Sequence, residues 1–99
     1  MNQITIKIQD KEYIVKQGFG SLMLFEEMTG KNVFEVNESI SDMIKLFYCY
    51  LKARNKDTFL FSFDEFVNIL DDNQEIFTEF YGYLKSLQPT KEIDSLKKK

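Results

Sequence analysis

The first part of the chain alternates between apolar and polar positions. Isoleucine stands at every second position from Ile4 to Ile8, and a Tyr-Ile-Val run follows a polar break at Asp10. Period-two alternation of β-branched residues on both sides of a polar break is typical of two paired strands. The pattern therefore predicts a β-hairpin over residues 3–17.

After the hairpin, the apolar residues recur at the spacing of α-helices. The expected helices cover approximately residues 22–28, 40–54 and 63–70, and a last one begins within residues 72–75 and runs to about residue 88. An extended connector is expected over residues 31–38. The predicted fold class is mainly α (α+β), with an N-terminal β-hairpin followed by about four short helices.

Residues at the segment ends support these helices. Ser39 with Asp42, and Ser62 with Glu65, fit the capping box, in which the serine hydroxyl accepts from the third helical N–H and the acidic side chain reaches back. Gly30 stands where a helix often ends in a left-handed residue. The pattern therefore marks two helix beginnings and one helix end.

Gly18 and Gly20 precede the first helix and raise the question of a phosphate-binding loop. A Walker loop places its Gly-Lys pair before the helix, whereas Gly30 and Lys31 come after it, at the end where the helix dipole repels anions. We therefore interpret Gly18 and Gly20 as residues of a sharp turn, with Ser21 as the cap of the helix.

Composition and charge narrow the class of protein. The 99 residues include ten Phe and five Tyr, which can form the core of one domain, expected over residues 1–89, without a metal or a disulfide. Four lysines and two acids lie in residues 90–99, which leaves nine basic and fourteen acidic groups in the body. An acidic body is poorly suited to nucleic acid. The basic tail is expected to be flexible and disordered.

Targeting signals add little. No apolar run approaches the roughly 20 residues that a membrane span needs, and the first residues lack the apolar stretch of a signal peptide. We therefore expect a cytoplasmic protein without a membrane partner.

Catalytic chemistry has few candidate residues. The chain has no histidine, so imidazole bases and the usual transition-metal sites are excluded. Cys49 is expected to be partly exposed on the second helix, without a partner that would activate it. A calcium loop beginning at Asp71 fails because Ile76 and Gly82 stand where Gly and Glu are required. We therefore predict that the protein is not an enzyme and that it has no catalytic, metal-binding or cofactor-binding residue.

Apolar surface is the remaining feature. The apolar arc of the second helix spans about 200°, roughly twice that of a one-sided helix, so we expect burial on two sides. The first helix carries Glu26 and Glu27 as its only charges, with Phe19 and Met23 on a side away from Phe25. This helix therefore requires a neighbouring surface.

An aromatic segment follows the second helix. Phe59 and Phe61 either fill the core or form an interface, and the sequence leaves both interpretations open. The candidate partner-binding residues are Phe59, Phe61, Tyr50, Met23, Glu26, Glu27 and Asp64.

Several segments resemble a known family. They are Phe25-Glu26 followed by Thr29-Gly30-Lys31, Asp42 followed by a Leu/Tyr-rich helix ending near Arg54-Asn55, and Asp64-Glu65-Phe66. Over roughly residues 3–87 the chain resembles the tail assembly chaperones of long-tailed bacteriophages and prophages. The resemblance implies a non-enzymatic protein that binds the tape-measure protein, and possibly the tail-tube protein, in the host cytoplasm. It also implies that the protein is absent from the finished virion.

Alternative functions remain open at this point. The same composition also fits a small acidic regulatory or adaptor protein that binds a host or phage protein. The open strand edges of a two-stranded hairpin also allow a homo-oligomer. The sequence thus favours a protein-binding module and leaves its partner to be identified.

Overall fold

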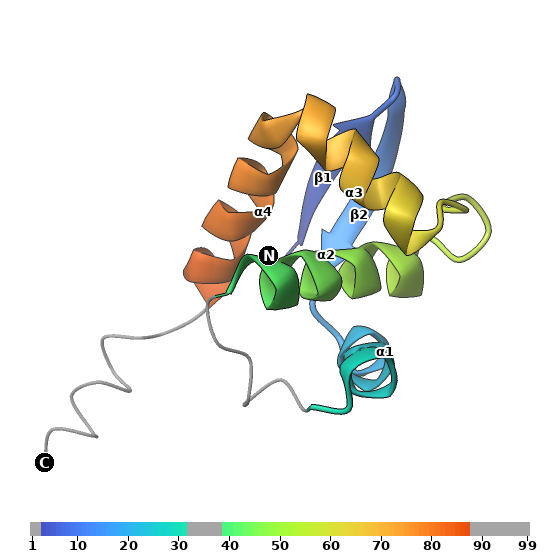
Figure 1. The fold of residues 1–99 in the computed structure, drawn as a ribbon, viewed down its shortest axis with the longest axis vertical. Coiled ribbons are helices and arrows are strands. Elements are labelled where there is room, and N and C mark those ends of the chain that lie inside the picture. The colour runs from blue at the N-terminus through green and yellow to red at the C-terminus, as the bar shows by residue number, and fades with distance from the viewer. Residues whose placement is uncertain (1–2, 32–38, 88–99) are drawn as a thin grey trace, which may run out of the picture.

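The computed structural model describes residues 3–31 and 39–87. Within these residues it contains an antiparallel hairpin and four helices (Figure 1). The elements are β1 (Gln3–Ile8), β2 (Lys11–Lys16), α1 (Phe19–Thr29), α2 (Ile40–Arg54), α3 (Phe63–Asp72) and α4 (Gln74–Leu87). The fold class expected from the sequence is confirmed. The expected connector, from residue 32 onward, and the expected tail lie outside the described residues.

The hairpin closes through a two-residue turn that contains no glycine. The strands pair from Gln3 with Lys16 to Ile8 with Lys11, and the turn residues Gln9 and Asp10 have φ angles of 52° and 69°. Left-handed backbone at both central residues matches the twist of paired strands in a type I′ turn. The two strands thus turn one apolar row toward the helices, and its buried members are Ile6, Ile8, Tyr13 and Val15.

Two side chains fix the hairpin to the helices. The Asn55 side chain accepts from the Ile14 N–H at 3.1 Å and donates to the Ile14 carbonyl at 2.9 Å, as a neighbouring strand would. At the end of β2, the Gln17 N–H donates to the Tyr83 hydroxyl at 2.9 Å. These bonds attach the outer edge of β2 to the end of α2, and the end of the hairpin to α4.

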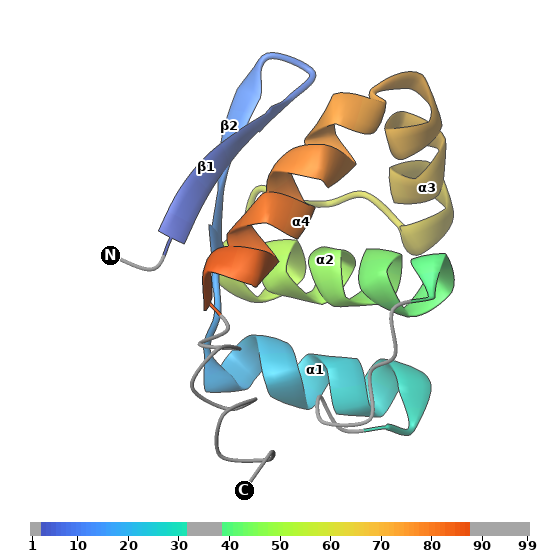
Figure 2. The ribbon, with the colours of Figure 1, turned by 90° about the vertical axis from the view of Figure 1, so that its left-hand side faces the viewer.

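Helix α2 occupies the middle of the molecule, in agreement with the burial on two sides that the width of its apolar arc predicted. Figure 2 shows it between α1 on one side and the α3–α4 pair on the other. It also packs against β2, while α4 packs against β1. Burial on two sides follows from this central position.

Aromatic rings fill the space between α2, α3 and α4. The Phe47 ring stacks on Phe80, with the ring centres 4.2 Å apart and the planes at 6°. Phe66 meets Phe47 edge-on at 5.1 Å, and Phe59 meets Phe66 edge-on at 5.7 Å. Stacked and edge-on arrangements are the favoured geometries of aromatic pairs, so these four buried rings hold the three helices together.

Two of the expected helix beginnings are observed. The Ser62 hydroxyl accepts from the Glu65 N–H at 3.1 Å, and the Glu65 carboxylate accepts from the Ser62 N–H at 2.8 Å. At α2, the Ser39 hydroxyl accepts from the Asp42 N–H at 3.2 Å, while the Asp42 carboxylate forms an ion pair with Lys31. The Ser62–Glu65 capping box is therefore complete. Asp42, in the first turn of α2, connects α2 to the end of α1.

The beginning of α1 differs from the expectation. The helix begins at Phe19, so Ser21 lies inside its first turn, where its hydroxyl donates to the Gly18 carbonyl at 2.8 Å. Gly18 is extended and Gly20 is helical, so neither forms the expected sharp turn. A Cβ at Gly18 would lie 3.2 Å from the Arg54 guanidinium, so glycine serves a close approach to α2 there. Gly30, with φ at 75°, ends the helix as predicted.

Truncation of one buried and one exposed phenylalanine tests this packing. Phe47→Ala removes the ring that stacks on Phe80 and should lower the free energy of unfolding by about 3–5 kcal/mol. Phe19→Ala, at an exposed position, should change it by less than about 0.5 kcal/mol. Urea unfolding followed by circular dichroism measures both, and equal losses in the two variants would contradict the assignment.

Candidate functional site

Two large apolar side chains are exposed on the outer side of α1. The large apolar residues exposed in the described part of the chain are Ile14, Phe19, Met23, Ile40 and Leu60. Phe19 and Met23, with 84% and 61% of their surface exposed, are four residues apart and thus share one side of the helix. Glu27 continues this row one turn later. We call Phe19, Met23 and Glu27 the α1 face.

The α1 face is exposed because α1 has apolar residues on more than one side. Its buried residues are Ser21 and Phe25, and Leu22, Leu24 and Met28 pack partly against the core. Helix α2 is the element against which it packs most extensively. One neighbour can cover only one side of a helix, so the opposite apolar residues remain in solvent.

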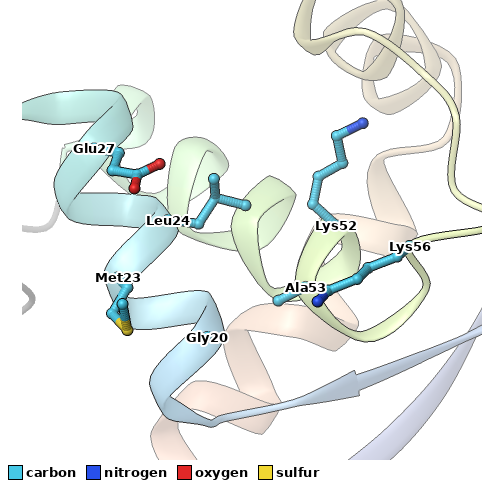
Figure 3. A pocket seen from close by; sticks show the side chains of 7 residues that line it. All are labelled: Gly20, Met23, Leu24, Glu27, Lys52, Ala53 and Lys56. Carbon is cyan, nitrogen blue, oxygen red and sulfur yellow. The ribbon is translucent and has the colours of Figure 1, made fainter.

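A groove of about 440 Å³ lies beside the α1 face (Figure 3). It is lined by Gly20, Met23, Leu24 and Glu27 from α1, and by Lys52, Ala53 and Lys56 from the end of α2 and the turn that follows. The helices approach closely here, since a Cβ at Gly20 would lie 3.8 Å from that of Ala53. This volume falls within the range of about 300–1,000 Å³ that is typical of small-molecule sites.

Charges of both signs border the groove. Glu27 lies on the α1 side, and Lys52 and Lys56 lie on the α2 side (Figure 3). The Lys52 ammonium is also 5.9 Å from the centre of the Tyr48 ring. The ion pair formed among the described residues joins Lys31 to Asp42, at 2.6 Å, and lies outside the groove lining. Within the described part of the chain, Glu27, Lys52 and Lys56 therefore form no ion pair with one another.

The structure divides the residues that the sequence proposed for partner binding. Met23, Glu26 and Glu27 lie together on α1, with Met23 beside the groove and both carboxylates exposed. Asp64 is exposed in the first turn of α3, on an element separated from α1 by α2 (Figure 2). Three of the proposed residues thus share one surface, and Asp64 belongs to another.

The prediction that Tyr50 and Phe59 bind a partner is wrong, because both side chains are buried. The Tyr50 ring lies edge-on to Phe80 at 5.5 Å and to Tyr83 at 6.4 Å, and burial raises the pKa of its hydroxyl. Phe59 lies edge-on to Tyr13 at 5.5 Å. These contacts with the hairpin and α4 place both rings in the core, so a partner cannot reach them in the folded protein.

Phe61 takes an intermediate position. It is half-buried, its ring meets Phe59 edge-on at 5.4 Å, and its carbonyl accepts from the Tyr48 hydroxyl at 2.8 Å. Leu60, between the two phenylalanines, is exposed. The side chain that this segment offers most fully to solvent is therefore Leu60.

The expectation that Cys49 is partly exposed is also wrong, because its side chain is buried. Its Sγ lies 3.8 Å from the Met28 Sδ, since α1 covers the side of α2 that faces away from the aromatic core. Burial raises the pKa of the Cys49 thiol to about 12. The thiolate, which is the reactive form, is therefore scarce at neutral pH.

The groove itself could not be found from the sequence. Phe19 and Met23 carried a signal, since they stand four apart on the side away from Phe25. Lys52 and Lys56 carried none, because their position beside α1 depends on how two helices pack. No interaction within either helix encodes that meeting.

Metal-ligand geometry and known proteins give no further assignment. Within residues 3–31 and 39–87, no three His, Cys, Asp or Glu side chains are grouped so that they could hold a metal ion. Across the same ranges, each helix is too short or too polar to cross a membrane. Comparison of the chain with known protein families, curated proteins and solved structures finds no match.

Thiol labelling tests the position of Cys49. At pH 8 a disulfide reagent should react with the native protein only as fast as the protein unfolds, because the thiol is buried and its pKa is near 12. In concentrated urea the labelling should be complete within the mixing time of a manual assay. Rapid labelling of the native protein would show that α1 does not cover Cys49.

Proposed function

We propose that this protein is a non-enzymatic assembly chaperone, which binds the tape-measure protein of a long-tailed phage and keeps it soluble while the tail forms. The observation that carries the proposal is the α1 face. A small acidic domain that already has a well-packed aromatic core leaves Phe19 and Met23 in solvent. Exposed apolar groups beside a groove are typical of a protein-binding surface.

The shape of the α1 face suits a helical client. Amphipathic helices bind by laying side chains spaced three or four residues apart into an apolar groove. Phe19 and Met23 form one such row, and Leu24 and Ala53 lie beside it in the groove. We infer that a client helix of two to three turns lies along α1 and places its apolar side chains on this row.

The methionine at position 23 suits a chaperone in particular. Methionine is unbranched and polarizable, so it adapts to apolar partners of different shape. A chaperone that covers successive segments of a long client benefits from such adaptability. The α1 face would therefore bind several related client helices with modest affinity.

Charge supports the same proposal. The chain carries a net charge of −3, and Glu26 and Glu27 are exposed next to the apolar row. Like-charged surfaces repel one another and discourage aggregation of the loaded complexes. The two carboxylates also favour client helices with basic residues at the flank of their apolar stripe.

Co-expression with the tape-measure protein tests the proposal. The double variant Phe19→Ser/Met23→Ser should leave most of the client in the insoluble fraction, because the apolar row is lost, while its circular dichroism spectrum stays that of the wild type. The matched control is Ile40→Ser/Leu60→Ser, which removes two exposed apolar side chains elsewhere. This control should keep the client soluble.

Two outcomes would count against the function. One is a client that is equally soluble without the chaperone. The other is a Phe19→Ser/Met23→Ser variant that protects the client as well as the wild type does, since the α1 face would then be irrelevant to binding.

A further inference from the structure

We propose that the α1 face also binds a second copy of this protein, in a two-fold symmetric dimer whose α1 helices lie antiparallel. A two-fold interface brings the same patch of both copies together, so the patch has to be complementary to itself. The α1 face and the groove beside it meet this requirement, because Phe19 and Met23 are apolar, Glu27 is acidic and Lys56 across the groove is basic.

The charges are separated along the helix axis. Glu27 is seven residues after Gly20, which corresponds to about 10 Å of helix. Lys56 lies at the other end of the groove, in the turn after Ala53, whose Cβ would be 3.8 Å from a Cβ at Gly20. Figure 3 shows Lys56 on the Gly20 side and Glu27 away from it. Of the charged residues that line the groove, Lys56 is thus nearest the start of α1 and Glu27 lies toward its end, while Lys52 lies on the α2 side, away from Gly20.

An antiparallel pair of α1 helices matches these charges. With the two-fold axis at Met23, the two Met23 side chains meet, and Phe19 of one copy lies opposite Glu27 of the other. Glu27 therefore arrives at the beginning of the other copy's α1, where Lys56 lies. The symmetry creates this pair of opposite charges twice, once at each end of the interface.

Like charges stay apart in the same arrangement. The two Glu27 side chains stand four residues on either side of the axis, which separates them by about 12 Å along the helices. This exceeds the distance of about 8 Å over which exposed charges interact at physiological salt. The two Glu26 side chains, three residues on either side of the axis, are about 9 Å apart along the helices, which is close to that distance. The two Glu27–Lys56 pairs favour the arrangement, in which Phe19 and Met23 leave the solvent.

The dimer should be weak and reversible. A pair of short helices buries less surface than the roughly 1,000 Å² of a stable interface, so monomer and dimer should exchange with concentration. The dimer follows from the α1 face alone, but its role rests on the proposed function. Self-association covers the surface that a client needs, so the dimer stores the chaperone with Phe19 and Met23 protected until a client helix displaces the second copy.

Sedimentation equilibrium of the purified protein, without any client, tests the dimer by a charge exchange. Glu27→Lys and Lys56→Glu should each raise the dissociation constant about tenfold or more, because each places like charges together at both ends of the interface. The double variant Glu27→Lys/Lys56→Glu should return it to within about threefold of the wild type. The control Glu79→Lys changes an exposed charge on α4 and should have little effect.

Each of the other results overturns the proposal. A wild-type protein that stays monomeric at several hundred micromolar has no such dimer. If it dimerises but the charge exchange fails to restore association, the copies meet through another surface. Circular dichroism of each variant checks that it is folded. Since no client is present, failure here leaves the client proposal standing, and failure of the co-expression test leaves the dimer standing.

Discussion

The stacking of Phe47 on Phe80 determines how the rest of the molecule is arranged. The two rings are nearly parallel and 4.2 Å apart, which fixes α2 against α4. Phe66 adds α3 at the edge of this stack, and Tyr50 fills the space between Phe80 and Tyr83. One side of α2 is thereby fully occupied. None of these ring pairs involves α1, so the outer side of the first helix is free to present apolar residues for another purpose.

Helix α1 then closes the other side of α2, and it packs against α2 more extensively than α3 does. Phe25 is buried and Cys49 lies against Met28, while the ion pair between Lys31 and Asp42 fixes the end of α1 to the beginning of α2. This contact positions α1 but covers only one of its sides, with Phe25 buried and Phe19 and Met23 exposed. The exposed α1 face and its groove are consequences of that geometry, and they give the domain a binding surface that leaves the core intact.

Periodicity and capping residues predicted the elements, because hydrogen bonds within a helix or between adjacent strands are local. The turn at Gln9 and Asp10 lacked the usual glycine, so its left-handed geometry was not foreseen. The burial of Cys49 and Tyr50 was not predicted either, since a helical wheel shows which side a residue occupies and not which neighbour covers that side. The groove depends on Lys56 meeting α1, a contact between segments far apart in sequence, and such contacts leave no periodic signal in a single chain.

The central claim is that the outer side of α1 is where this protein meets its partners. Hydrogen–deuterium exchange of the protein, alone at low concentration and then saturated with tape-measure protein, tests it most directly. Slower exchange is expected over Phe19–Thr29 and at the end of α2, with α3 and α4 unchanged. Protection confined to α3, α4 or the hairpin, with α1 exchanging as in the free protein, would contradict it.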